Sequence, residues 1–194
     1  FDEVFTGFYR TGTCFAFEQV GAAPDFLCLS KGLTGGFLPL SVTLTTSEIF
    51  EAFRGPTLEQ AFLHGHSYTA NPLACAAALA SWDLLHSSET QDRLAALVSA
   101  TAHHVQRLSA HPAGARARHL GTLGAIDVST VQGGYAANAN LSSRLRALAL
   151  KRGVLLRPLG RTLYSLPPYC TSAEQLARIY TVIEELLEEV SCSK

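Results

Sequence analysis

Lys31 is the residue of this 194-residue sequence whose position most strongly suggests chemistry. It follows the short apolar run at residues 26–29 after a single serine and precedes the glycine-rich segment 32–36. Ligands gather at the carboxyl ends of strands in open α/β sheets, and a partly desolvated lysine there can attack carbonyl groups as an amine nucleophile. A solvated loop lysine fits the same position equally well. The other lysines are Lys151 and Lys194.

Three more charged residues suit ligand binding. Asp2 is one of them, because an aspartate that follows a strand can hold a cationic ring nitrogen through a charge-assisted hydrogen bond. Against this, an acidic pair such as Asp2 and Glu3 near a chain end is ordinarily exposed to solvent. Arg157 ends a short apolar run and could bind a carboxylate through both guanidinium nitrogens, or form a structural ion pair. Arg10 leaves the same two interpretations open.

Residues 64–69 (HGHSYT) form a polar cluster just before a helix start at Asn71 and Pro72. Hydroxyl and backbone N–H groups at a helix start form a natural phosphate site. His64 and His66 could also bind a metal, but no third ligand stands at a suitable spacing. We therefore predict an anion site here and no metal.

Helix and strand patterns alternate along the chain, which indicates the α/β class with a domain boundary near residue 87. The run at residues 26–29 suits a strand buried on both faces. Capping boxes precede two of the helices, at residues 88–91 and 171–174. The predicted strands are 26–29, 40–45, 123–128, 154–157 and 162–166. The predicted helices are 47–53, which Ser47 would cap, 72–85, 88–110 and 140–152. A final amphipathic helix would carry on one face Leu176, Ile179, Ile183, Leu186 and Val190.

The composition excludes several classes of protein. Apolar residues make up 47% of the chain and charged residues 16%, with 15 basic residues against 16 acidic ones. Such a chain is globular rather than disordered, and it lacks the basic excess of a protein that binds nucleic acid by charge. No apolar run reaches the roughly 18 residues of a membrane span. The five cysteines lack metal-ligand spacing and predict buried free thiols in a reducing, cytoplasmic compartment.

Five segments, taken in order, resemble the class III pyridoxal-phosphate aminotransferases. Residues 2–12 (DEVFTGFYRTG) are similar to the family's DEVxTGFxRTG segment, and residues 24–36 to its lysine segment. Residues 64–77, 153–160 and 164–169 resemble the subgroup that acts in biotin synthesis. The resemblance implies fold-type I of the pyridoxal-phosphate-dependent transferases, which is the aspartate aminotransferase-like fold.

The resemblance also implies roles for single residues around pyridoxal 5′-phosphate. Lys31 would form a Schiff base with the cofactor and then move the proton of the reacting substrate. Asp2 would pair with the pyridinium nitrogen and keep it protonated. Ser67 aligns with the hydroxyl residue that reaches the cofactor phosphate of the neighbouring subunit, which implies a homodimer.

Three further positions match substrate contacts in this subgroup. Arg157 would bind the carboxylate of the keto substrate, with Arg10 and Tyr164 close by. The implied reaction transfers an amino group from S-adenosylmethionine to 8-amino-7-oxononanoate and gives 7,8-diaminopelargonate. A different class III enzyme acting on an ω-amine remains an alternative, as does lysine as the amino donor. The partners are small molecules, without nucleic acid or membrane.

Family members are about twice as long as this chain. We therefore expect residues 1–87 to be the end of the large cofactor domain and residues 88–194 to be the small C-terminal domain. The absence of Met also indicates that the sequence does not start where translation starts. The isolated chain should be inactive, and a truncated, non-catalytic dimerisation module is the non-enzymatic alternative.

Overall fold

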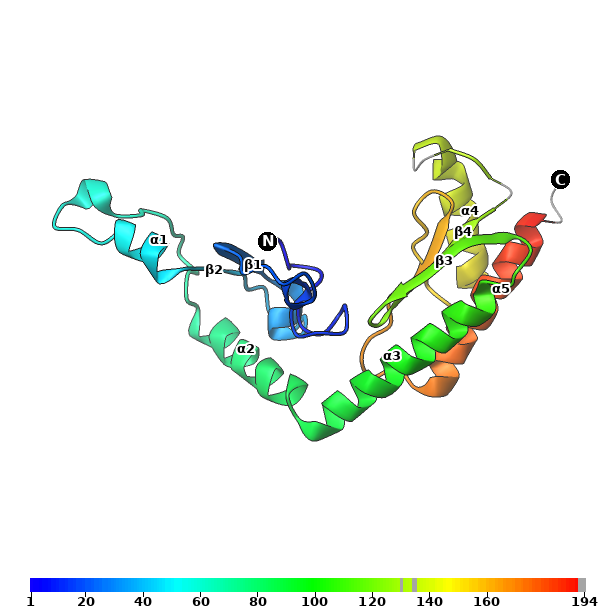
Figure 1. Ribbon diagram of the computed structural model, residues 1–194, viewed down its shortest axis with the longest axis horizontal. Coiled ribbons are helices and arrows are strands. Elements are labelled where there is room, and N and C mark those ends of the chain that lie inside the picture. Colours follow the sequence, from blue (N-terminus) through cyan, green and yellow to red (C-terminus); the bar gives the residue numbers. More distant parts are fainter. Residues whose placement is uncertain (130, 134–135, 192–194) are drawn as a thin grey trace. The chain divides into compact units, whose positions relative to one another are not determined.

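The computed structural model describes residues 1–129, 131–133 and 136–191 (Figure 1). Two units make up the chain, Phe1–Gln91 and Asp92–Lys194. Helices and strands occur in both units, as the alternating sequence pattern predicts. The division between the units falls within the first turn of helix α3 (Ser88–Leu108).

Strand β1 (Phe26–Leu29) of the first unit is paired along both of its edges. It pairs in antiparallel fashion with β2 (Val42–Thr45), while Asp2 forms a parallel bridge with Cys28 on its other edge. Leu27 and Leu29 are buried, but Phe26 is 48% exposed and Cys28 is half-buried. The prediction of burial on both faces was therefore wrong, because this unit covers only the face that carries the two leucines.

The first unit also contains three short 3₁₀-helices and two α-helices. Helix α1 is capped by Thr46, whose hydroxyl accepts from the Ile49 N–H, and not by the first residue of the helix as predicted. Helix α2 begins as predicted, because the Asn71 side chain accepts the N–H groups of Leu73 and Ala74. In chain order these elements are η1 (Ala16–Gln19), η2 (Lys31–Thr34), α1 (Ser47–Ala52), η3 (Leu58–Gln60) and α2 (Pro72–Leu85).

The second unit packs helices against a three-stranded antiparallel sheet of order β3-β4-β5. Strand β3 was not predicted, because its GARARHL sequence alternates alanine with arginine and has little apolar signal. The strand predicted at 154–157 was also wrong, since that segment is irregular. The elements are β3 (Gly114–Leu120), β4 (Leu123–Val128), η4 (Ala136–Asn138), α4 (Ala139–Lys151), β5 (Thr162–Ser165) and α5 (Ala173–Ser191).

Helices α3 and α5 begin with the predicted type of cap, shifted by one residue. The Ser87 hydroxyl, rather than Ser88, accepts the N–H of Thr90 at the start of α3. At the start of α5, Ser172 and Gln175 form the reciprocal pair that the pattern placed one residue earlier. Helix α4 ends as predicted before Gly153, which adopts a φ of +78° that other residues disfavour.

The core of the second unit lies between one face of the sheet and its helices. Ile126, Val128 and Leu163 are fully buried there, together with Leu186 of α5 and Leu145 of α4. Helix α5 supplies more residues to this core than any other element, and four residues of its predicted apolar face are buried: Leu176, Ile183, Leu186 and Val190. Among the described residues, no helix is long and apolar enough to cross a membrane.

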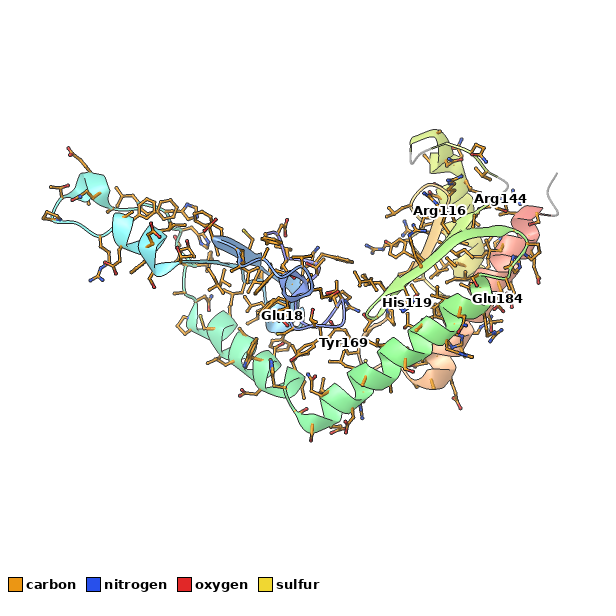
Figure 2. The ribbon with its side chains drawn as sticks, viewed as in Figure 1. Glu18, Arg116, His119, Arg144, Tyr169 and Glu184 are labelled. Carbon is orange, nitrogen blue, oxygen red and sulfur yellow. The ribbon has the colours of Figure 1, made fainter. Side chains whose placement is uncertain are left out.

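Asp127 faces the opposite side of the same sheet and is completely buried. Arg116 of β3 (Figure 2) donates from Nε to its Oδ2 at 2.7 Å, and Arg118 donates to Oδ1 at 3.1 Å. The Thr162 hydroxyl of β5 donates to Oδ1 at 2.9 Å. Burial raises the pKa of Asp127, but the hydrogen bonds from these three donors outweigh it and lower the pKa below its ordinary value. One carboxylate thus joins all three strands.

Replacement of Asp127 by asparagine should destabilise the second unit by about 1–3 kcal/mol, because the amide cannot accept all of these hydrogen bonds. The measurement is urea unfolding of the whole protein that contains this chain, compared with Asp92→Asn, which alters an exposed carboxylate of α3. Since the folded pKa of Asp127 is lowered, its contribution is fully present above pH 3.8 and disappears as the pH falls below that value. A gap between wild type and Asp127→Asn that does not shrink in acid would contradict this assignment.

Candidate active site

Asp2 and Lys31 stand at the same end of two adjacent parallel segments. The Cys28 N–H donates to the Phe1 carbonyl at 3.0 Å, and the Glu3 N–H donates to the Cys28 carbonyl at 2.9 Å. Residues 1–3 therefore run beside β1 in the same direction, and Lys31 follows the end of β1 by two residues. Because parallel strands end at one edge of a sheet, the pairing sets Asp2 on the segment next to the strand that leads to Lys31.

The Lys31 backbone is held in an unusual conformation. Its φ is +40°, in the left-handed region that non-glycine residues seldom adopt and that is often found at functional sites. The next residue, Gly32, has no room for a side chain, since a Cβ atom there would lie 2.6 Å from the Phe8 ring. The short helix η2 then ends at Gly35, whose φ is +62°. The turn that carries Lys31 is thus packed tightly on Phe8.

The two charged groups differ in their local contacts. The Lys31 ammonium lies 5.3 Å from the centre of the Phe5 ring, a cation–π contact, and the residue as a whole is exposed. The exposed Asp2 carboxylate accepts the Val4 N–H at 3.0 Å through Oδ1. An oriented carboxylate and an accessible primary amine are the donor set that suits a cofactor with a cationic ring nitrogen and an aldehyde.

Glu3, by contrast, is almost completely buried, with 1% of its surface exposed. Its neighbour Asp2 is exposed, so the expectation that the acidic pair lies in solvent was wrong for Glu3. Successive side chains of an extended segment point to opposite faces, and this period of two is the signal that could have separated the two carboxylates. Phe5 and Phe8 were missed as well, because nothing in their local sequence indicates contact with Lys31 and Gly32, more than 20 positions away.

Arg10 lies half-buried in the loop between Glu3 and η1. The same loop contains Cys14 and Tyr9, whose backbone groups are joined by a 3.1 Å hydrogen bond from the Tyr9 N–H to the Cys14 carbonyl. Burial raises the pKa of the Cys14 thiol, and the nearby Glu18 carboxylate raises it further. Burial likewise raises the pKa of the Tyr9 phenol. Neither group is therefore an activated nucleophile.

Ser67 occupies the tight turn before α2. The Thr69 N–H donates to the His66 carbonyl at 3.0 Å, and the His66 N–H donates to the Thr69 hydroxyl at 2.9 Å. The Tyr68 N–H donates to His66 Nδ1 at 3.1 Å, so this imidazole is part of the turn. Ser67 itself is exposed. Its hydroxyl is therefore presented to the outside of this unit.

Arg157 and Tyr164 belong to the second unit and lie on the two arms of one hairpin. Leu159 pairs with Thr162 through two 2.9 Å backbone hydrogen bonds. The Tyr164 arm is anchored by its neighbour Ser165, whose hydroxyl lies 2.9 Å from the Tyr180 hydroxyl in the core. Arg157 and Tyr164 thus lie before and after one tight turn of the chain.

The prediction that the cysteines are buried free thiols is confirmed in part. Cys14, Cys28, Cys75 and Cys170 are free thiols, but none is fully buried, and Cys170 is exposed. Cys192 lies outside the described residues.

The family profile described as aminotransferase class-III matches residues 1–187, and the chain therefore belongs to this family. Its fold is fold-type I of the pyridoxal-phosphate-dependent transferases, an α/β fold. Among curated relatives, the adenosylmethionine-8-amino-7-oxononanoate aminotransferase of Synechococcus elongatus is 49% identical over 97% of this chain. The enzyme of the same name from Helicobacter pylori is 41% identical over 98% of the chain.

Solved structures of aminotransferases are similar in fold to this chain. The adenosylmethionine-8-amino-7-oxononanoate aminotransferase of Methanocaldococcus jannaschii has a TM-score of 0.84 and 30% identity, covering 96% of this chain and 44% of its own. An amine transaminase from an uncultivated Pseudomonas species, solved in its PLP-bound form, has a TM-score of 0.82 and 31% identity, covering 96% and 43%. The present chain spans 44% of the length of the Synechococcus and Helicobacter relatives.

A methyl group at Gly32 should disrupt the Lys31 turn. We expect Gly32→Ala to lower the free energy of unfolding by about 1–3 kcal/mol, because the added carbon overlaps the buried Phe8 ring. Gly65→Ala is the matched control, since the nearest atom to a Cβ there, Thr69 Oγ1, is at an ordinary 3.6 Å. Chemical unfolding of both variants checks this, and equal stability of the two would refute the close packing.

Proposed function

We propose that the whole protein containing this chain is a pyridoxal-phosphate-dependent aminotransferase that converts 8-amino-7-oxononanoate to 7,8-diaminopelargonate with S-adenosylmethionine as amino donor. The observation that carries this proposal is the presentation of Asp2 and Lys31 at one edge of paired parallel segments. The curated relatives that bear this enzyme name, at up to 49% identity, support the choice of substrates.

The residues of the first unit fit pyridoxal phosphate by their chemistry. When bound, this cofactor supplies an aldehyde that takes up the amino group and a protonated ring that draws electrons from the reacting carbon. Lys31 would hold it through its amine, with loss of one water, and would carry a proton to and from the substrate carbon. Asp2 would accept a hydrogen bond from the ring nitrogen and favour its protonated form.

The hairpin of the second unit would select the substrate. Arg157 is exposed. Its guanidinium would bind the carboxylate of 8-amino-7-oxononanoate through paired N–H donors. Tyr164 and Arg10 would be further contacts of the substrate. We assign residues 1–87 to the large domain and residues 88–194 to the small one.

We further propose a homodimer in which Ser67 reaches the cofactor phosphate of the partner subunit. The outward position of its turn supports this. Helix α2, which follows the turn, exposes Leu73, Leu79 and Leu84 at 73%, 67% and 68%, an apolar surface that a second subunit would cover. The free thiols of the described cysteines support a reducing, cytoplasmic compartment.

A second candidate is another class III reaction on an ω-amine. Solved relatives at 30–31% identity carry the names omega-transaminase and amine transaminase. The curated relatives that support the first candidate are more similar. Assays of the whole protein with 8-amino-7-oxononanoate and either S-adenosylmethionine, lysine or an ω-amine distinguish these reactions and the amino donor.

Lys31→Ala in the whole protein should abolish formation of 7,8-diaminopelargonate and covalent attachment of pyridoxal phosphate. The attachment is measured as mass added after borohydride reduction. Lys151→Ala is the control, because it removes an exposed lysine at the end of α4 and should keep both properties. A Lys31→Ala protein that still carries the cofactor after reduction would contradict the proposal.

A further inference from the structure

Glu3 has a carboxylate that the proposed reaction does not use. Oε2 accepts the Thr6 hydroxyl at 2.9 Å and the Ala16 N–H at 2.7 Å, and Oε1 accepts the Phe17 N–H at 2.7 Å. Burial of an ionised carboxylate is costly unless such donors compensate for the lost water. The donors come from near both ends of the segment 4–17. The Glu3 carboxylate therefore holds the two ends of this segment together as a loop.

The loop is held in a conformation that the chain would not adopt alone. Phe8 and Tyr9 have φ values of +60° and +68°, two consecutive non-glycine residues in the left-handed region. The Gly7 N–H donates to the Glu3 carbonyl at 3.1 Å, just before these two residues. Conformations of this kind persist only where surrounding contacts enforce them, and the bonds to Glu3 are contacts of that type.

The loop contacts Lys31 and the adjacent Gly32 through two aromatic rings. The Phe8 ring, 4% exposed, fills the space where a side chain at Gly32 would lie. The Phe5 ring lies against the Lys31 ammonium at 5.3 Å. The left-handed turn at Lys31 therefore packs against Phe5 and Phe8, whose positions depend on the loop that Glu3 closes.

We propose that Glu3 is a positioning residue: its buried carboxylate shapes the loop 4–17, and through Phe5 and Phe8 this loop sets the place from which the Lys31 amine meets a carbonyl cofactor. The inference rests on the proposed function for the identity of that cofactor. Its physical content is that a neutral amide at this position cannot replace the carboxylate, since only one of the two amide heavy atoms accepts hydrogen bonds.

The test compares Glu3→Gln with Glu18→Gln in the whole protein. Glu18, labelled in Figure 2, also accepts a backbone N–H of this loop, from Phe15 at 2.9 Å, but it is exposed. Pyridoxal phosphate is the probe, and its attachment to Lys31 is trapped with borohydride over time and mapped by peptide mass. Glu3→Gln should slow attachment about tenfold or more, whereas Glu18→Gln should change it by less than about twofold.

A second measurement separates positioning from general loss of stability. Amide hydrogen exchange should accelerate in residues 4–17 and 30–34 of Glu3→Gln and stay unchanged in the second unit. Leu145→Ala, which opens the core of the second unit, should lower the unfolding midpoint yet leave attachment at Lys31 unchanged. If Glu3→Gln fails to fold, Thr6→Val removes one donor to the same carboxylate and should slow attachment in the same direction.

The failures of the two proposals are distinguishable. Wild-type protein that attaches no pyridoxal phosphate at Lys31 would refute the proposed function, and the inference would fall with it. Normal attachment in wild type together with an unchanged rate in Glu3→Gln, or in Thr6→Val where the first variant does not fold, would overturn the positioning role alone. Slowing in Leu145→Ala equal to that in Glu3→Gln would also overturn it, because the effect would then be one of stability.

Discussion

The parallel pairing of residues 1–3 with β1 is the constraint from which the candidate site follows. Two backbone hydrogen bonds, at 3.0 and 2.9 Å, join Cys28 to Phe1 and Glu3. Adjacent residues of such a segment face opposite sides, so Asp2 points its carboxylate outward and Glu3 buries its own. The first carboxylate is left available for a ligand, and the second organises the loop on which Lys31 rests. One pairing thus gives two identical chemical groups different roles.

A second buried carboxylate has a comparable place in the other unit. Asp127 joins the three strands of the sheet, and Thr162, one of its donors, closes the hairpin that carries Arg157 and Tyr164. In both units an acidic side chain without direct access to water fixes the backbone beside residues proposed to bind ligands. Such buried polar networks rigidify a site when every group in them is satisfied.

Local sequence was sufficient to predict much of this. The strand before Lys31, the helix opened by Asn71 and the apolar face of α5 follow from patterns within a few residues, and the structure confirms all three. The buried Glu3 and the strand β3 were beyond such reasoning. Glu3 is compensated by donors 13 and 14 positions away, and β3 is stabilised by an aspartate on the neighbouring strand. Tertiary contacts decided both cases, and the roles of the site residues remain predictions.

The most direct test of the central claim is a crystal structure of the whole protein grown with pyridoxal phosphate. The account predicts a covalent bond between Lys31 Nζ and the cofactor, with the Asp2 carboxylate about 3 Å from its ring nitrogen. It also predicts that residues 1–3 stay paired with β1. A cofactor bound to another lysine, or an Asp2 side chain turned away from the ring, would contradict it.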